Sequence, residues 1–104
     1  MQGARGCDPL TVSGRLDGTS VTEVRASLEG LIAATDGDVV VDLTCVDVID
    51  AVGLGMLAAA HRRLERAGRH LVLRGCAGHV RRVLAVTGLN RVLHVEPVLR
   101  RVSA

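Results

Sequence analysis

Apolar and polar residues alternate along some stretches of the chain and recur every three to four positions along others. Residues 10–16 alternate with a period of two, which predicts a strand with one buried face. Short aliphatic runs predict three more strands at 39–43, 70–73 and 92–95. The consecutive valines of 39–43 suggest burial on both faces, so we expect this strand to be central.

The stretches between these strands show the spacing of helices with one buried face. The first predicted helix begins at Ser20, which forms a capping box with Glu23. The second runs from Val52 to about Arg66 and is closed by Gly68, and the third ends at Gly88. The residues expected to face the core are Val21, Val24, Leu28, Leu31, Ile32, Leu54, Leu57, Leu64, Val80, Val83, Leu84 and Thr87. The polar residues expected outward or at the margin of the second helix are His61, Arg62 and Arg66.

Strands and helices alternate from one end of the chain to the other. This order predicts a single α/β domain with a mostly parallel or mixed sheet of four to five strands and helices packed on it. We expect the domain to span residues 1–104, with a core at about 10–95. The segment 1–9 is expected to be loose or a weak edge strand, and the basic tail 97–104 to add a final helical turn.

Residues 46–60 contain the most informative turn of the sequence. Apolar and acidic residues alternate up to Ile49, and Asp50 then lies where its side chain can accept hydrogen bonds from the first free N–H groups of the next helix. Gly53 and Gly55 are poor helix formers, so we expect them to permit close approach, either by a neighbouring strand or by a molecule bound from outside. We predict that this turn is the functional centre.

Charge is distributed unevenly, although the formal net charge is only +2. Residues 1–52 hold three arginines and nine acidic residues, a net charge of −6, whereas residues 53–104 hold ten arginines and two glutamates, a net charge of +8. An acidic half and a basic half in one small domain suggest a polar face for a protein partner, although helices that simply face solvent would also carry charge.

The composition also limits where the protein works. Residues 1–10 carry Arg5 and Asp8 and lack an apolar run, so we expect no signal peptide. The longest apolar stretch, 51–60 counting glycine, is half the length of about 20 residues that a membrane span needs. We therefore expect a cytoplasmic protein with an aliphatic core, since Phe, Trp and Tyr are absent. An odd number of cysteines without a C-x-x-C pair fits reduced thiols: Cys7, Cys45 and Cys76.

Four short motifs occur in a fixed order along the chain. They are Ser13-Gly-Arg-Leu-Asp17, the strand 39–43, Asp50-x-x-Gly53-Leu-Gly55 at a helix start, and Thr87-Gly-Leu89. In this order they resemble the STAS domains, a family named for sulfate transporters and anti-sigma factor antagonists, over about residues 10–95. The resemblance implies a bacterial protein of transcription regulation that acts through protein–protein interaction and is not an enzyme.

The resemblance also implies roles for residues at the turn. Bacterial antagonists of this family carry Asp-Ser-Ser/Thr-Gly-Leu there, and their first serine is phosphorylated by a partner kinase that is itself the anti-sigma factor. The matching residues here are Asp50, Ala51, Val52, Gly53 and Leu54, so alanine replaces the phosphoacceptor. The implied partner is an anti-sigma factor or serine-kinase-like protein, bound by Asp17, Gly18 and residues 50–54. Because phosphoserine would add close to two negative charges beside Asp50, alanine resembles the unphosphorylated, binding-competent state.

Alternatives within the family stay open. The alanine could mark a diverged domain that no longer recognises a kinase and serves instead as a subunit or regulator of a membrane transporter for lipids or anions. Phosphorylation on Thr44 or Thr87 would not share the geometry of the family site. A weak homodimer is a further alternative.

Other motifs compete with the protein-binding hypothesis. A dinucleotide-binding pattern is matched by Gly53-Leu-Gly55-Met-Leu-Ala58, and Arg74 is placed to bind a 2′-phosphate. Against this reading, Asp50 would face the negatively charged pyrophosphate. The corresponding alternative function is a nucleotide-binding sensor. Cys76, near Arg74 and His79, is a candidate redox thiol of lowered pKa. His61 with Glu65 and His79 with Cys76 give too few ligands for zinc, so we expect no metal and no cofactor.

Arginines on the second and third helices raise the question of nucleic acid binding. Without aromatic residues to stack on bases and without a known DNA-binding motif, we expect no direct nucleic acid partner. A solvated helix face or a docking surface for an acidic partner accounts better for Arg62, Arg63, Arg66, Arg69, Arg81 and Arg82.

Overall fold

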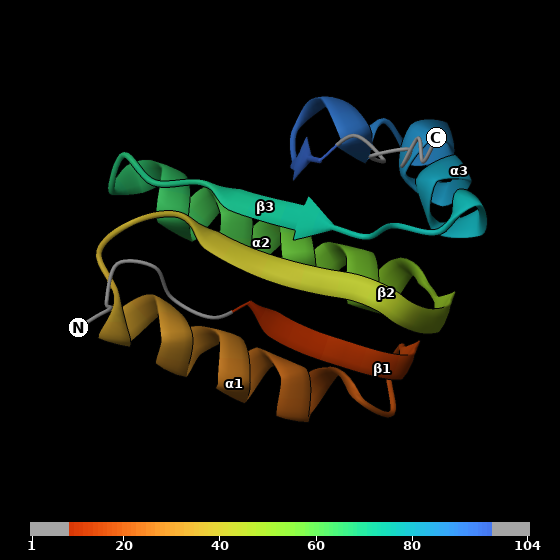
Figure 1. Cartoon of the computed structure of the whole chain (residues 1–104), viewed down its shortest axis with the longest axis horizontal. Helices are drawn as coiled ribbons and strands as arrows, with labels where there is room; N and C mark the ends of the chain where they lie inside the picture. Colours follow the sequence, from red (N-terminus) through yellow and green to blue (C-terminus); the bar gives the residue numbers. More distant parts are fainter. Residues whose placement is uncertain (1–8, 97–104) are drawn as a thin grey trace, which may run out of the picture.

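The structure, a computed structural model, describes residues 9–96. The elements follow the order β1 (Leu10–Leu16), α1 (Val21–Ala34), β2 (Val39–Ile49), α2 (Ala51–Arg66), β3 (Leu71–Arg74), α3 (Gly78–Thr87), the 3-10 turn η1 (Leu89–Arg91) and β4 (His94–Val95). All paired strands are parallel and lie in the order β1-β2-β3-β4 (Figure 1). The predicted α/β fold is confirmed, with β2 in an inner position of a four-stranded sheet. The expectations for 1–8 and for the tail 97–104 lie outside the described residues.

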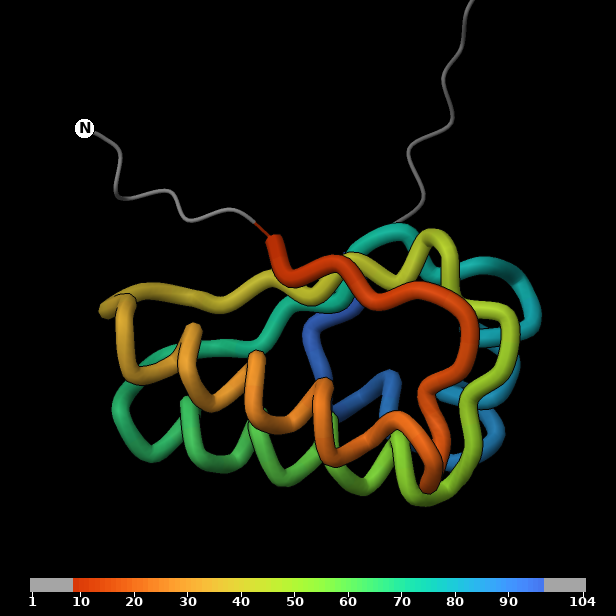
Figure 2. Tube along the Cα trace, turned by 90° about the horizontal axis from the view of Figure 1, so that it is seen from below, coloured from red at the N-terminus to blue at the C-terminus, as the bar shows by residue number. Residues whose placement is uncertain are grey.

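The two long helices cover one face of the sheet. Figure 2 shows α1 and α2 side by side beneath the strands, and Figure 1 shows α3 beyond β3, near β4. The core between the layers is aliphatic and includes the fully buried Leu16, Leu28, Leu43, Leu57, Leu64, Leu71 and Leu73. No helix in residues 9–96 is long and apolar enough to cross a membrane. Because parallel strands end at one edge, the first turns of all three helices gather there.

Strand β2 differs from the prediction in length and burial. It continues to Ile49 as one strand, because two irregularities in its register with β1 let its residues 41–49 run beside the seven residues of β1. Gly14 of β1, with a φ of 74°, lies beside the second irregularity, where β2 has one extra residue. Val39 and Val41 are fully buried but Val40 only partly, so the expected burial on both faces is wrong.

The start of α1 also differs from the prediction. Ser20 precedes the helix, but its side chain makes no capping hydrogen bond. Its hydroxyl donates to the carbonyl of Arg15 at 2.7 Å, and the carbonyl of Asp17 accepts the N–H groups of Ser20 and Val21. The predicted capping box with Glu23 is therefore wrong, because the serine is used to close the preceding turn.

The buried side of α2 contains one polar residue that the sequence placed outside. Leu54, Leu57 and Leu64 face the core as predicted, but His61 is only 2% exposed. Its ring lies 5.8 Å from that of His94, and its Nε2 lies 3.9 Å from a carboxylate oxygen of Glu65. His61 is thus part of the packed face, and its predicted position outside or at the margin is wrong.

At the edge opposite the helix starts, one arginine joins two connections. The guanidinium of Arg69, after α2, donates to the carbonyls of Gly37 at 2.8 Å and Ile32 at 3.1 Å and to the hydroxyl of Thr35 at 3.0 Å. It thereby satisfies a free carbonyl in the last turn of α1. Arg69 belongs to the structure of the domain and not to an exposed basic surface.

Candidate functional site

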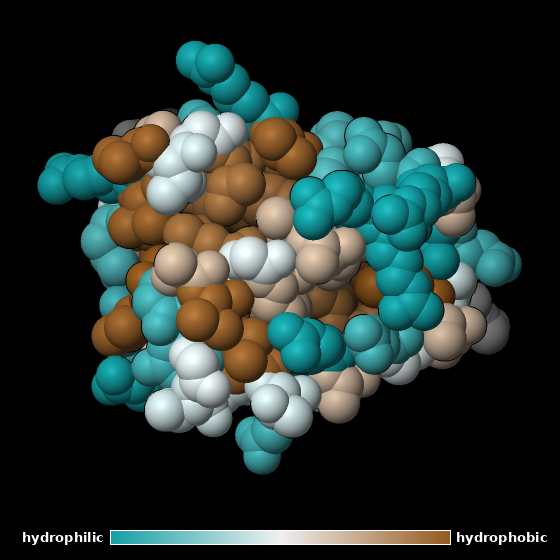
Figure 3. Space-filling model, turned by 180° about the vertical axis from the view of Figure 1, so that it is seen from behind, coloured by the Kyte–Doolittle hydropathy of each residue, from teal (hydrophilic) through white to brown (hydrophobic). Residues whose placement is uncertain are grey.

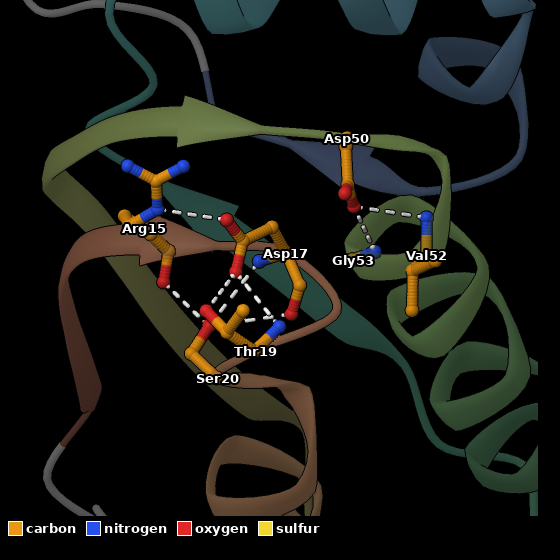
Figure 4. Close-up of polar contacts among 7 residues, drawn as sticks. All are labelled: Arg15, Asp17, Thr19, Ser20, Asp50, Val52 and Gly53. Atoms are coloured by element: carbon orange, nitrogen blue, oxygen red, sulfur yellow. Dashed lines mark hydrogen bonds and ion pairs between the residues drawn. The ribbon is translucent and has the colours of Figure 1, made fainter.

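Two strand-to-helix turns lie side by side at the edge where the strands end (Figure 4). We call Asp17–Ser20, between β1 and α1, the Asp17 turn, and Asp50–Gly53, between β2 and α2, the Asp50 turn. In the β1–β2 register Leu16 pairs with Ile49, so each aspartate directly follows a paired residue. The structure therefore brings together the two segments that the sequence proposed as one surface.

In the Asp50 turn, the aspartate caps α2. One carboxylate oxygen, Oδ1, accepts the N–H groups of Val52 and Gly53, both at 3.0 Å. The carbonyl of Asp50 accepts the N–H of Leu54 at 2.9 Å, which starts the helical hydrogen bonds. The predicted capping role is confirmed. Because the carboxylate already occupies two of the free N–H groups, an anion would have to displace it, which weakens the nucleotide-binding alternative.

Gly53 and Gly55 have different surroundings although both lie in the first two turns of α2. A Cβ on Gly53 would overlap the carbonyl oxygen of Leu16 and lie 2.9 Å from its Cγ, whereas a Cβ on Gly55 would have no neighbour within 4 Å. The close approach at Gly53 is made by β1. The expectation that Gly53 admits a partner to its backbone is therefore wrong, and only Gly55 is open to the outside.

The Asp17 turn is closed by its own side chains. Asp17 is 6% exposed, and one of its oxygens accepts the N–H of Thr19 at 3.0 Å and its hydroxyl at 2.6 Å. The other oxygen accepts the Nε of Arg15 at 2.8 Å. The hydroxyl of Thr19 and, next, the Arg15 guanidinium lower the pKa of Asp17 from 3.8 to about 2, so it is ionised at neutral pH.

A single backbone carbonyl connects the two turns. The oxygen of Leu16 accepts the N–H of Asp50 at 3.3 Å and is the atom that a Cβ on Gly53 would overlap. The Asp50 turn is thus held against the end of β1 from two directions. Sequence reasoning missed the roles of Leu16, Arg15 and Thr19, and the only local signal was a threonine two residues after an aspartate, the spacing of an Asx-type turn.

The predicted site residues divide into exposed and buried groups. Gly18, Asp50, Ala51 and Val52 are exposed, and Val52 retains 49% of its surface. Gly53 and Leu54 are buried, with Leu54 at 5% exposure. The accessible surface therefore combines a carboxylate, one methyl group and one isopropyl group, and the buried residues fix its shape from below. Such a surface can bind another protein, but it contains no nucleophile with a base beside it.

The redox and 2′-phosphate candidates do not have the environment that those functions need. Cys76 is 3% exposed, and burial raises the pKa of its thiol against the opposing effect of Arg81, so the predicted activation is wrong. Arg74 is paired with Glu96, with its Nε 3.1 Å from a carboxylate oxygen, instead of being free for a 2′-phosphate. Within residues 9–96, no group of three or more His, Cys, Asp or Glu is arranged to hold a metal ion.

Comparisons with known proteins agree with the four motifs and with the fold. The family described as "Mlab, STAS domain" matches residues 1–99. The chain belongs to the STAS domain family. This STAS domain is 31% identical over 90 residues to the anti-sigma-B factor antagonist of Listeria monocytogenes, which covers 86% of the chain and 78% of the relative. It is 29% identical over 87 residues to the anti-sigma-B factor antagonist of Staphylococcus aureus, which covers 84% and 81%.

Solved structures give the same relation. An anti-sigma factor antagonist from Mycobacterium paratuberculosis is 29% identical to this STAS domain and superposes with a TM-score of 0.75 over 94% of the chain and 83% of the solved chain. The anti-sigma factor antagonist SpoIIAA in its unphosphorylated form superposes with a TM-score of 0.64 over 86% and 77%. At 18% identity, this second likeness supports the fold alone. The family resemblance of the motifs is confirmed.

Proposed function

We propose that this STAS domain is a non-enzymatic anti-sigma factor antagonist that binds an anti-sigma factor of serine-kinase type through the Asp17 and Asp50 turns. The observation that carries the proposal is the exposed Ala51–Val52 pair at the start of α2, beside the capping Asp50. The names of the relatives support the class of partner. Ala51 stands where the family pattern has its phosphoacceptor. Because no phosphate can be attached to alanine, no phosphatase is needed before this domain can bind its partner.

The physical basis of binding lies in the composition of this surface. Val52 leaves half of its surface in water, and its burial would contribute favourable free energy, while Asp50 and the ionised Asp17 offer acceptors at the margin. A phosphate at position 51 would bring about two negative charges to a surface that already holds these carboxylates. An alanine there removes that source of repulsion permanently, so regulation would act through protein level or another input.

The first experiment is affinity purification of the full chain from its own cells, followed by mass spectrometry of partner and bait. We expect recovery of a kinase-like anti-sigma factor with an unphosphorylated bait. Ala51→Glu should abolish recovery, because it adds a charge to the centre of the surface; a glutamate in the first helical turn is favourable for α2, so the fold should persist. Ala26→Glu, a matched change at an exposed position of α1, should leave recovery unchanged. Equal recovery with all three baits would remove the Asp50 turn from the interface.

A second variant tests the meaning of the alanine. Ala51→Ser restores a hydroxyl at an exposed position, and we expect the recovered partner with ATP to phosphorylate this variant but not the wild type. Phosphorylation of wild type at any residue of the surface would contradict the proposal. Recovery of membrane transporter subunits in place of an anti-sigma factor would support the transporter-associated alternative.

A further inference from the structure

A second surface lies between α1 and α2, apart from the two aspartate turns. A groove of about 330 Å³ is lined by residues of both helices, which lie side by side in Figure 2. Its lining residues are Arg25, Leu28, Glu29, Ile32, Met56, Ala59, Ala60, Arg62, Arg63 and Arg66. We call it the α1–α2 groove. Figure 3, which shows the helical side, has hydrophilic side chains gathered at one end of this face and hydrophobic ones at the other.

The rim of the α1–α2 groove is strongly basic. Four arginines and a single glutamate line it, and the glutamate is opposed by Arg63 at 3.7 Å across the two helices. Within residues 9–96, the guanidinium groups of Arg25, Arg62 and Arg66 have no carboxylate partner of their own. Planar guanidinium groups match carboxylates with two parallel hydrogen bonds, so this rim is complementary to a ligand with several acidic side chains.

The floor of the α1–α2 groove is apolar. It is lined by Leu28, Ile32 and Met56, which are almost fully buried, and by two more accessible alanines of α2, Ala59 and Ala60. Small residues between two packed helices let a third helix approach closely and bury its own apolar side chains there. Aliphatic groups do not favour a ligand that is charged along its whole length. Because the chain has no aromatic residue, the groove also offers no surface on which nucleic acid bases could stack.

The α1–α2 groove is separate from the candidate site. Eleven residues of α2 separate Ala51 from Arg62, which corresponds to about 16 Å along the helix axis at the usual rise per residue. On α2 the groove is lined by residues from Met56 to Arg66, so its lining does not include the Asp50 turn. A partner segment in the groove would leave the Asp50 turn free, and the groove does not depend on the proposed function of that turn.

We propose that the α1–α2 groove is a docking site for an acidic amphipathic helix of a protein partner. The apolar face of that helix packs on Ala59 and Ala60, above the buried Leu28, Ile32 and Met56, and its acidic side chains pair with Arg62 and Arg66 and with Arg25 on the other wall. Glu29 favours one basic residue in the partner helix, because that residue can replace Arg63 as the cation beside the Glu29 carboxylate.

The test is selection from a display library of random peptides of about 16 residues, long enough for four helical turns, on the purified full chain. We expect enrichment of acidic sequences with apolar residues at i, i+3, i+4 and i+7. A synthetic enriched peptide should bind in fluorescence anisotropy, and Arg62→Glu with Arg66→Glu should weaken it at least about tenfold. Arg82→Glu with Arg91→Glu, an equal charge change at exposed positions outside the groove, should change affinity by less than about threefold.

Two further variants separate this proposal from its competitors. Ala59→Trp changes no charge but fills the floor, and it should weaken the peptide while the thermal midpoint stays within a few degrees of wild type. Ala51→Glu should leave peptide binding unchanged, since Ala51 does not line the groove. Enriched peptides without an acidic excess, an equal loss in both double variants, or a loss on Ala51→Glu alone would overturn the proposal. So would more effective displacement of the peptide by anionic phospholipid vesicles or by a single-stranded oligonucleotide.

Discussion

The two aspartate turns use the same residue at the same structural position for different purposes. Asp17 and Asp50 each follow the last paired residue of a parallel strand and each precede a helix. Asp17 is buried among Thr19, Arg15 and its own turn, whereas Asp50 is exposed and its carboxylate is directed at the backbone of α2. The first aspartate fixes a loop, and the second fixes the start of a helix that carries the candidate surface.

This difference shows which of the two turns can change with function. The Asp17 turn uses its side chains on itself, although Gly18 and Thr19 remain exposed. The Asp50 turn uses only one carboxylate oxygen for capping and leaves positions 51 and 52 outside the packed layer. Substitution at position 51 can therefore alter recognition or regulation without a cost in stability.

The largest effect should come from forcing the two turns apart. Gly53→Ala places a methyl group on the carbonyl of Leu16, so α2 or β1 must shift and the hydrogen bond from the Asp50 N–H is lost. We expect the free energy of unfolding to fall by about 2–3 kcal/mol, the upper part of the range for overpacked sites, because the neighbouring atom is a backbone oxygen. Urea denaturation measures it. A loss below about 0.5 kcal/mol would show that the contact with β1 does not constrain the turn.

The next effect comes from removal of the cap alone. Asp50→Ala deprives the N–H groups of Val52 and Gly53 of their acceptor, and we expect a loss of about 1 kcal/mol in the free energy of unfolding. Asp50→Ser keeps a capping oxygen and should recover most of that loss. If alanine and serine variants were equally stable, the cap would not hold the start of α2, and the contrast with Asp17 would lose its basis.

A smaller effect of opposite sign is expected two residues beyond Gly53. Gly55→Ala adds a methyl group into open space and restricts the unfolded chain, so the free energy of unfolding should rise by about 0.5–1 kcal/mol. The same urea titration, with Gly53→Ala beside it, measures the contrast within one helix. Equal changes in the two variants would mean that helix propensity and not the contact with Leu16 controls both positions.

The last prediction concerns pH and the Asp17 turn. Since the folded pKa of Asp17 is about 2 and its ordinary value is 3.8, the stability that this carboxylate contributes is present above about pH 4 and is lost as the pH falls through 2. Thr19→Val removes the hydroxyl that lowers the pKa most, so the pKa should move toward 3.8 in an NMR titration. The stability difference from wild type should be largest above pH 4 and should narrow toward pH 2. Thr22→Val, at an exposed position of α1, is the matched control and should leave the pKa of Asp17 unchanged.

The parts of the fold that could be predicted are those decided by neighbouring residues. The bounds of β1 at 10–16 follow from strict alternation, and the end of α3 follows from Gly88, whose φ of 80° is rarely adopted by other residues. The cap at Asp50 could be predicted for the same reason, because the carboxylate and its two N–H donors lie within three residues.

The parts that could not be predicted depend on contacts between distant segments. The register with β1 gives β2 two extra residues, which join the predicted strand 39–43 and the alternating residues 46–49 into one strand. His61 is buried because the packing of α2 places it near His94, which is remote in sequence. The sequence allowed two kinds of close approach at Gly53, and the expected approach by a partner is wrong because Leu16 of β1 occupies that position.

The three hydrogen bonds of Arg69 have a consequence for the local opening of the domain. They link the end of α1 to the connection between α2 and β3, across more than thirty residues of chain. Fraying of α1 from its last turn would break these bonds, so the amide protons of both connections should exchange with solvent as one cooperative unit. Opening at this end of the molecule should therefore be detected as joint exchange of both connections, separately from exchange at the aspartate turns.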